Sequence, residues 1–221
     1  MTNKIIGIQG DKLDKINISS DTSIFLAHEA QKLGYKIFYY TPSNLSIIKN
    51  KTYANGVFVK LNYERKKFYK IYKKQKIDVE NLKFILIRQD PPFNSEYLIT
   101  TLILDDLKKT RVINNPIAIR NVSEKLYSKK FTKYMPDTIF SNNIEEVKKF
   151  YKQNKSIIMK PINGYGGNQI HLIKNKFNKK LITNFLKKNG HSMFQKFLKN
   201  ISKGDKRVFI INGKVCGAIS R

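Results

Sequence analysis

The stretch from Met159 to Ile170, MKPINGYGGNQI, contains the residue types that bind phosphate groups. Lys160 ends an apolar run, and a turn with Gly164, Gly166 and Gly167 follows it. Glycines permit positive backbone dihedral angles and leave no side chain in the way, so the N–H groups of such a turn can converge on an anion. A lysine ammonium at the strand end would add a point charge to the same phosphates. Taken alone, such a stretch is more often a flexible hairpin tip than a phosphate-binding loop.

The loop does not match the common phosphate-binding motifs. It lacks the Gly-Lys-Ser/Thr ending of a P-loop, and it lacks the spacing and the following helix of a dinucleotide fingerprint. The pattern instead predicts a strand at Ile157–Lys160, a glycine-rich turn, and a partner strand at Ile170–Ile173.

The N-terminal half has the pattern of a parallel sheet. A short apolar run at Ile5–Ile8, a helical pattern from Ser20 to Gly34 and a strand at Lys36–Tyr40 form a βαβ unit. The further elements predicted in this half are a hairpin within Asn44–Asn62, a helix at Lys66–Lys76, a strand at Phe84–Ile87, a helix at Glu96–Lys109 and a strand at Val112–Ile113.

Arg88 to Pro92 follows the predicted strand at Phe84–Ile87 directly. Its double proline excludes a helix and a strand ladder, so we expect an exposed turn at the carboxyl end of that strand. Ligands bind at this edge in open α/β sheets. Arg88 and Asp90 therefore either contact a substrate or stabilise the turn as a pair.

The pattern changes after Asn115-Pro116, which favours two domains, residues 1–118 and 119–221. In the second, we predict a helix at Val122–Phe131 that carries Lys125, a strand at Thr138–Phe140, and a helix beginning at Asn143. The strand–glycine loop–strand unit follows, then a helix at Lys180–Lys188, a strand at Ser192–Phe197, and a hairpin of Arg207–Ile211 with Val215–Ser220.

The composition is strongly basic, with 43 Lys and Arg against 16 Asp and Glu and a net charge of +27. The lysines are spread along the whole chain, which favours a diffuse solvated surface over a nucleic-acid footprint. A nucleic-acid-binding module remains the alternative from a different class.

Cys216 is the only cysteine, which we expect to be buried in a strand, and neither cysteine nor histidine has metal-ligand spacing. Without a membrane-spanning run, we expect a cytoplasmic protein with no membrane partner.

An ordered set of motifs resembles the ATP-grasp superfamily and, within it, the prokaryotic glutathione synthetase family. The motifs are Arg88-Gln89-Asp90-Pro91-Pro92-Phe93, Asn115-Pro116, Arg120-Asn121, Glu124-Lys125-Leu126, Lys160-Pro161, Asn163-Gly164-Tyr165-Gly166-Gly167 and Gly204-Asp205-Lys206-Arg207. The resemblance covers essentially the whole chain. It implies an α/β fold, with an N-terminal pre-ATP-grasp parallel-sheet domain followed by an incomplete ATP-grasp α+β module.

The resemblance also implies a reaction. ATP phosphorylates the free carboxylate of γ-glutamylcysteine, and the amine of glycine attacks the acyl phosphate to give glutathione, ADP and phosphate. The cofactors implied are ATP as co-substrate and Mg²⁺, and the complete protein is expected to be a homo-oligomer. The alternative within the superfamily is another carboxylate–amine ligase with a different acceptor.

The family's binding residues map onto this sequence by motif. The resemblance implies that Lys125 and Lys160 contact the phosphates of ATP. The loop that covers those phosphates would consist of Gly164, Tyr165, Gly166 and Gly167. The residues implied around adenine are Gln195, Lys196, Phe197 and Leu198. Arg207 and Arg221 would be catalytic, facing the transferred phosphate and the peptide substrate. Lysines and backbone N–H groups suit this task because phosphoryl transfer needs charge neutralisation and alignment.

The resembling proteins continue well beyond the position of Arg221. Their further segment includes a second glycine-rich lid and the Asp, Glu and Asn ligands of Mg²⁺. We therefore expect no metal ligands in these 221 residues and no turnover by this chain alone.

Overall fold

The structure is a computed structural model that describes residues 4–64 and 67–220. The chain forms two compact units, Met1–Ser123 and Glu124–Arg221. Arg221, one of the two predicted catalytic arginines, lies outside the described residues.

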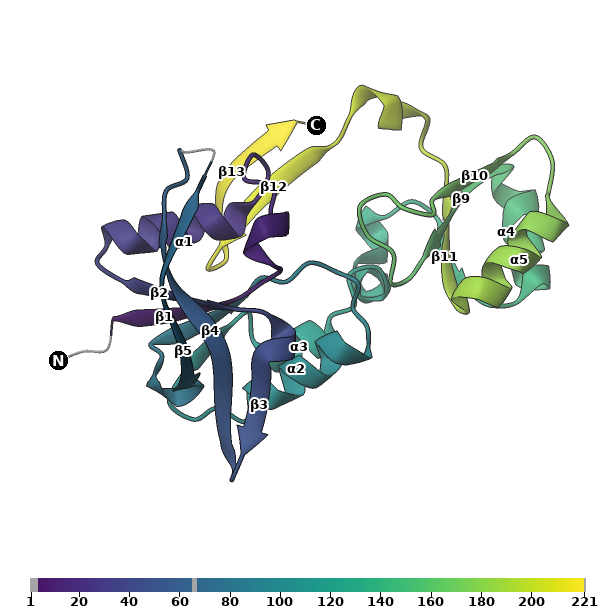
Figure 1. Cartoon of the computed structure of the whole chain (residues 1–221). Coiled ribbons are helices and arrows are strands. Elements are labelled where there is room, and N and C mark those ends of the chain that lie inside the picture. The colour runs from purple at the N-terminus through teal and green to yellow at the C-terminus, as the bar shows by residue number, and fades with distance from the viewer. Residues whose placement is uncertain (1–3, 65–66, 221) are drawn as a thin grey trace. The chain divides into compact units, whose positions relative to one another are not determined.

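The first unit contains a seven-stranded mixed sheet (Figure 1). Its strands are β1 (Ile5–Gln9), β2 (Lys36–Tyr40), β3 (Leu45–Ile48), β4 (Lys51–Leu61), β5 (Tyr69–Asp78), β6 (Phe84–Ile87) and β7 (Arg111–Ile113). The order is β3-β4-β2-β1-β6-β7, with β5 paired to β4. Strands β2, β1, β6 and β7 run parallel, as the βαβ pattern predicts, whereas β3, β4 and β5 add an antiparallel extension.

Helices α1 (Thr22–Lys32) and α2 (Ser95–Asp105) pack on the sheet of the first unit through separate apolar clusters. Side chains alternate between the two faces of a strand, so neighbouring strand residues join different clusters. Tyr39 packs in the cluster that contains Ile24 of α1, and Phe38 packs in the one that contains Leu104 of α2. Three short 3₁₀ turns connect these elements, at Leu13–Lys15, Pro42–Asn44 and Val79–Asn81.

The predicted helix at Lys66–Lys76 is wrong. Lys66 lies outside the described residues, and Tyr69–Asp78 is strand β5, antiparallel to β4. Aromatic and β-branched side chains such as those of Tyr69, Ile71 and Tyr72 favour a strand when a partner strand is available. The helix predicted at Glu96–Lys109 is too long, because α2 ends at Asp105.

The chain between Asn115 and Tyr134 also differs from its prediction. Asn115 caps helix α3 (Pro116–Asn121) by accepting from the Ala118 N–H, with Pro116 in the first turn, where its missing N–H costs nothing. The helix predicted at Val122–Phe131 is wrong. A 3₁₀ segment, η4 (Leu126–Tyr134), occupies most of the region, and Phe131 within it has non-helical angles.

The second unit contains a four-stranded antiparallel sheet in the order β10-β9-β11-β8 (Figure 1). The strands are β8 (Thr138–Ser141), β9 (Ser156–Pro161), β10 (His171–Lys174) and β11 (Ser192–Lys196), and the helices are α4 (Ile144–Asn154) and α5 (Lys179–Asn189). Ile157, Met159 and Phe194 pack with Val147 of α4 and Ile182 of α5 in one buried cluster. This core fixes which strand residues point away from the helices.

A short 3₁₀ turn, η5 (Lys199–Lys203), precedes a separate two-stranded sheet of β12 (Lys206–Ile211) and β13 (Lys214–Ser220). The predicted hairpin is confirmed, with Asn212 and Gly213 both at positive φ in its turn. Cys216 is exposed on β13, so the expectation that it is buried is wrong. None of the helices in the described ranges has the length and apolar character needed to cross a membrane.

Candidate functional site

Lys160 lies on the face of the second-unit sheet that points away from α4 and α5. Along β9, Ile157 and Met159 are buried against the helices, and Lys160 is only half-buried. Strand alternation therefore places Lys160 on the opposite face. Its partner across the ladder is Met193 of β11.

The Lys160 ammonium has a neutral hydrogen-bond partner. Its Nζ donates to Oε1 of Gln195 at 3.0 Å. Burial lowers the pKa of Lys160 from its ordinary value of 10.5, and the positive charge of Lys125 lowers it further. The neutral amide oxygen holds the ammonium without a compensating negative charge, so a bound anion would be its counter-ion.

Lys125 reaches the glycine loop from the residue before η4. Its Nζ donates to the carbonyl oxygens of Gly164 and, at 3.5 Å, Ile162. An ion pair with Glu124 at 3.9 Å adds little, because 79% of the Glu124 side chain is exposed. Lys125 therefore contacts the glycine loop, and it lies close enough to Lys160 for its charge to act on that ammonium.

The glycine loop joins β9 to β10, as the sequence pattern predicts. Two turn hydrogen bonds shape it: Gly164 N–H donates to the Pro161 carbonyl at 3.3 Å, and Asn168 N–H donates to the Tyr165 carbonyl at 3.0 Å. Gly166 and Gly167 have φ values of 59° and 76°, a conformation that side-chain-bearing residues rarely adopt. Residues 165–170 of the loop are exposed, so a ligand can reach them from solvent.

Gln195 contacts both neighbouring strands through its side chain. Its side chain bridges Lys160 and Thr138, donating through Nε2 to Thr138 Oγ1 at 2.9 Å. The local sequence around Thr138 gives no signal of this contact, because the partner lies on a strand far along the chain. Thr138 and Gln195 are direct cross-strand partners of β8 and β11.

Two of the other residues predicted around adenine, Lys196 and Phe197, donate their N–H groups to backbone carbonyls. The N–H of Lys196 donates to the Asp137 carbonyl at 2.8 Å, and that of Phe197 donates to the Ser156 carbonyl at 3.0 Å. Leu198 follows, half-exposed, at the start of η5. Adenine would therefore have to use backbone groups other than these two N–H groups.

Arg207 lies on a different sheet from Lys160. It is exposed on β12, where it pairs with Ile219 of β13. Its assignment as a catalytic residue therefore rests on the motif and not on a contact with the lysines.

Arg88 and Asp90 lie at the carboxyl end of β6 in the first unit, as predicted. The Arg88 side chain donates to Thr22 Oγ1 at 2.7 Å and to Ser23 Oγ at 3.0 Å, and so holds the first turn of α1. The Asp90 N–H donates to the Asp11 carboxylate at 2.8 Å. Within the described residues no ion pair joins Arg88 to Asp90.

This strand edge also carries negative charge. Burial raises the pKa of the Asp90 carboxyl above its ordinary value of 3.8, the charges of Asp11 and Asp21 raise it further, and Arg88 lowers it. The edge is therefore an acidic spot on a basic protein, with Arg88 as its nearby cation.

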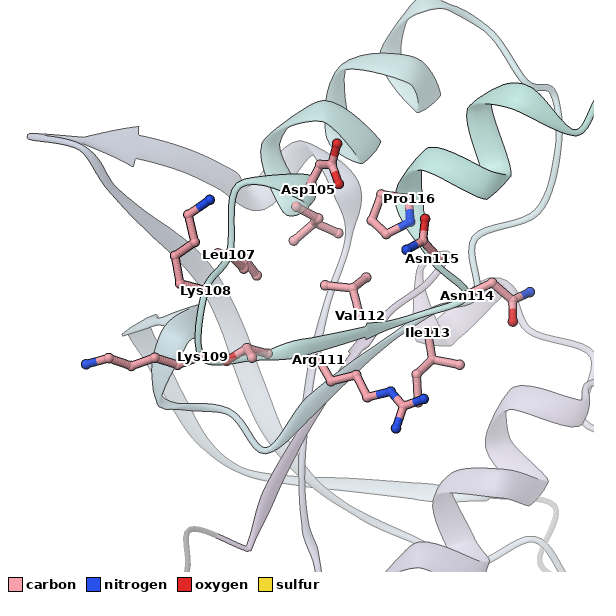
Figure 2. Close-up of a pocket in the computed structure, with 12 residues that line it drawn as sticks. Asp105, Leu107, Lys108, Lys109, Arg111, Val112, Ile113, Asn114, Asn115 and Pro116 are labelled. Carbon is pink, nitrogen blue, oxygen red and sulfur yellow. The ribbon is translucent and has the colours of Figure 1, made fainter. Parts of the chain in front are cut away.

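A hollow of about 560 Å³ lies beside β7 in the first unit and contains none of the predicted site residues. It includes Lys108, Lys109 and Arg111, a set that resembles an anion site by type. Figure 2 shows that the charged ends of these three side chains point in different directions. A phosphate needs convergent cations, so this hollow is a weaker phosphate candidate than the lysines of the second unit.

The described residues form no cluster of metal-ligating side chains. Residues 4–64 and 67–220 contain no group of three or more His, Cys, Asp or Glu side chains that could hold one. We therefore assign no Mg²⁺ ligand among them.

Solved structures show which class of protein has this fold. The RimK domain protein ATP-grasp from Sphaerobacter thermophilus has a TM-score of 0.63 at 11% identity, covering 98% of this chain and 72% of that one. D-alanyl-alanine synthetase A from Vibrio cholerae has a TM-score of 0.57 at 15% identity, covering 97% and 66%. At these identities the likeness shows the fold alone, which is that of the ATP-grasp proteins.

Sequence comparisons define the family. Profiles described as "Prokaryotic glutathione synthetase, N-terminal domain" and "Prokaryotic glutathione synthetase, ATP-grasp domain" match residues 5–120 and 124–221. Glutathione synthetase of Mesorhizobium japonicum is 36% identical over 223 residues, covering 98% of this chain and 70% of the relative. That of Buchnera aphidicola subsp. Acyrthosiphon pisum is 37% identical over 216 residues, covering 95% and 67%. The chain belongs to the prokaryotic glutathione synthetase family.

Proposed function

We propose that this chain binds ATP through Lys125, Lys160 and the loop of residues 163–167, as part of an ATP-dependent ligase that joins γ-glutamylcysteine to glycine. The observation that supports this most directly is the convergence of the two ammonium groups and the glycine loop within the unit that matches the ATP-grasp profile. Two cations and backbone N–H groups of the loop would neutralise a triphosphate and align its terminal phosphoryl group.

The proposed reaction has two steps. A carboxylate oxygen of γ-glutamylcysteine attacks the terminal phosphorus of ATP, which gives an acyl phosphate and ADP. The glycine amine then attacks the acyl carbon, expels phosphate and loses a proton to solvent, which leaves the new amide bond. Arg207 and Arg221 are proposed to stabilise the charged intermediate through their guanidinium groups.

Arg88 and Asp90 are proposed as substrate-side residues. Support comes from their position at the carboxyl ends of parallel strands, where open α/β sheets bind ligands. The acidic spot formed with Asp11 and Asp21 suits an ammonium group of the substrate, and Arg88 suits a carboxylate.

Phosphate release tests the assignment. The 221-residue chain and the Mesorhizobium japonicum relative would be assayed with ATP and Mg²⁺, with γ-glutamylcysteine and glycine together or singly, and with other amine acceptors. Release by the relative that requires both substrates, together with ATP binding by this chain, supports the proposal. A chain that fails to bind ATP with Mg²⁺ while folded contradicts it, and stimulation only by another acceptor pair favours a different carboxylate–amine ligase.

The nucleic-acid alternative predicts a different behaviour. Binding to nucleic acid would weaken steeply as salt increases, because counterions are released on association.

Three expectations stay predictions: the homo-oligomer, the cytoplasmic location, and the absence of turnover by this chain alone.

A further inference from the structure

Three hydrogen bonds connect the backbone of Pro136 to the ammonium group of Lys160. Thr138 Oγ1 donates to the Pro136 carbonyl at 2.7 Å. Gln195 Nε2 donates to Thr138 Oγ1 at 2.9 Å, and Lys160 Nζ donates to Gln195 Oε1 at 3.0 Å. The three side chains come from adjacent strands β8, β11 and β9 of one sheet.

The direction of this series follows from the number of protons available. A threonine hydroxyl has one proton, and in this structure Thr138 donates it to Pro136. Towards Gln195 the hydroxyl can therefore only accept, which requires the NH₂ end of the Gln195 amide to face Thr138. The carbonyl end must then face Lys160, where it accepts from the ammonium.

The sheet makes this arrangement stiff. Thr138 and Gln195 face each other directly across the β8–β11 ladder, and Lys160 is on the neighbouring strand β9. Side chains on regular strands hold a position more accurately than side chains on loops. The amide oxygen directs the ammonium without a negative charge that would compete with a bound phosphate.

We propose that Thr138 is a positioning residue for nucleotide binding, which acts through the orientation of the Gln195 amide on the ammonium of Lys160. This inference rests on the proposed function, since it assumes that Lys160 binds the phosphates. It assigns Thr138 no contact with the nucleotide. Its effect depends on Lys160 being present.

The first test compares Thr138→Val, Thr138→Ala and Thr138→Ser in the full 221-residue chain. Valine has the shape of threonine without the hydroxyl, alanine is a second hydroxyl-free variant, and serine keeps the donor and the acceptor. We expect the valine and alanine variants to bind ATP, with Mg²⁺ present, about three- to tenfold more weakly, as for the loss of one hydrogen bond. The serine variant should stay within about twofold of the unmodified chain.

The second test is a double-mutant cycle with Lys160→Met. If Thr138 acts through Lys160, Thr138→Val should weaken ATP binding in the unmodified chain and leave it unchanged in the Lys160→Met background. A purely structural effect of valine would appear in both backgrounds.

These results decide whether Thr138 acts on ATP binding through Lys160 or affects only the structure of the sheet. Equal affinities of Thr138→Val and the unmodified chain, a serine variant as weak as the valine variant, or the same loss in both backgrounds would overturn the inference. An unmodified chain that binds no ATP would instead refute the proposed function. Denaturant unfolding of every variant shows that each is folded under the conditions of the titration.

Discussion

Replacing Lys160 with methionine tests the candidate site at its central charge. Methionine keeps the apolar stem of lysine and removes the ammonium, so packing on the sheet face is largely retained. A hydrogen bond to a charged partner contributes about 1.5–3 kcal/mol. We therefore expect ATP, in the presence of Mg²⁺, to bind about 10- to 100-fold more weakly to Lys160→Met.

The same substitution should change the free energy of unfolding much less. It leaves Oε1 of Gln195 without its donor, which costs about 1 kcal/mol for a group that water can reach in part. It also removes a partly buried charge whose pKa is lowered by burial and by Lys125, and this offsets the cost. A loss of affinity without a loss of stability is the expected signature of a binding residue.

Lys174→Met is the matched control. Lys174 is an exposed lysine on β10 of the same sheet, opposite Ser156 at the far end of β9 from Lys160. Isothermal titration with ATP and Mg²⁺, at several salt concentrations, should show unchanged affinity for Lys174→Met. Equal affinities for Lys160→Met and Lys174→Met would show that overall basicity, and not this site, attracts the nucleotide.

Two further substitutions test the loop and a carboxylate of the first unit. Gly167→Ala should lower the free energy of unfolding by about 1–2 kcal/mol, as measured by denaturant unfolding. The reason is backbone strain alone, because φ is 76° at Gly167 and an added Cβ meets no atom within 4 Å. The control is Gly217→Ala in strand β13, where an added Cβ also meets no atom within 4 Å, and it should show no such loss. For Glu80, burial raises the pKa of the carboxyl, but the N–H groups of residues 108–110, at 2.6, 2.8 and 2.9 Å, and the charge of Lys109 bring it below its ordinary value of 4.5. A carboxyl whose pKa is lowered in the folded state stabilises the protein above pH 4.5, and this stabilisation is lost as the pH falls through the folded pKa. Glu80→Gln should therefore unfold about 1 kcal/mol more easily at pH 7. A difference in unfolding free energy that stays constant down to acid pH would contradict this account.

Local sequence predicted the parts of the fold that depend on near neighbours. Alternating apolar residues and turn glycines predicted the strand–loop–strand unit around Gly166, and the βαβ pattern predicted the parallel strands of the first unit. The helix predicted at Lys66–Lys76 was wrong because β4, its pairing partner, determines the conformation of that segment. The helix predicted at Val122–Phe131 was wrong because Asn115 and Pro116 begin a helix earlier, and η4 follows it.

The sequence by itself determined the family and the residue types of the candidate site, because each motif that contains Lys125, Lys160 or the loop glycines is a continuous stretch of the chain. Only the tertiary structure decided that Lys125 contacts the loop carbonyls and that Lys160 donates to Gln195, whose amide in turn donates to Thr138. The reason is that Thr138, Lys160 and Gln195 are far apart in sequence and become neighbours through antiparallel strand pairing. The register of those strands, set by the apolar core on the other face, determines which side chains share a face with Lys160.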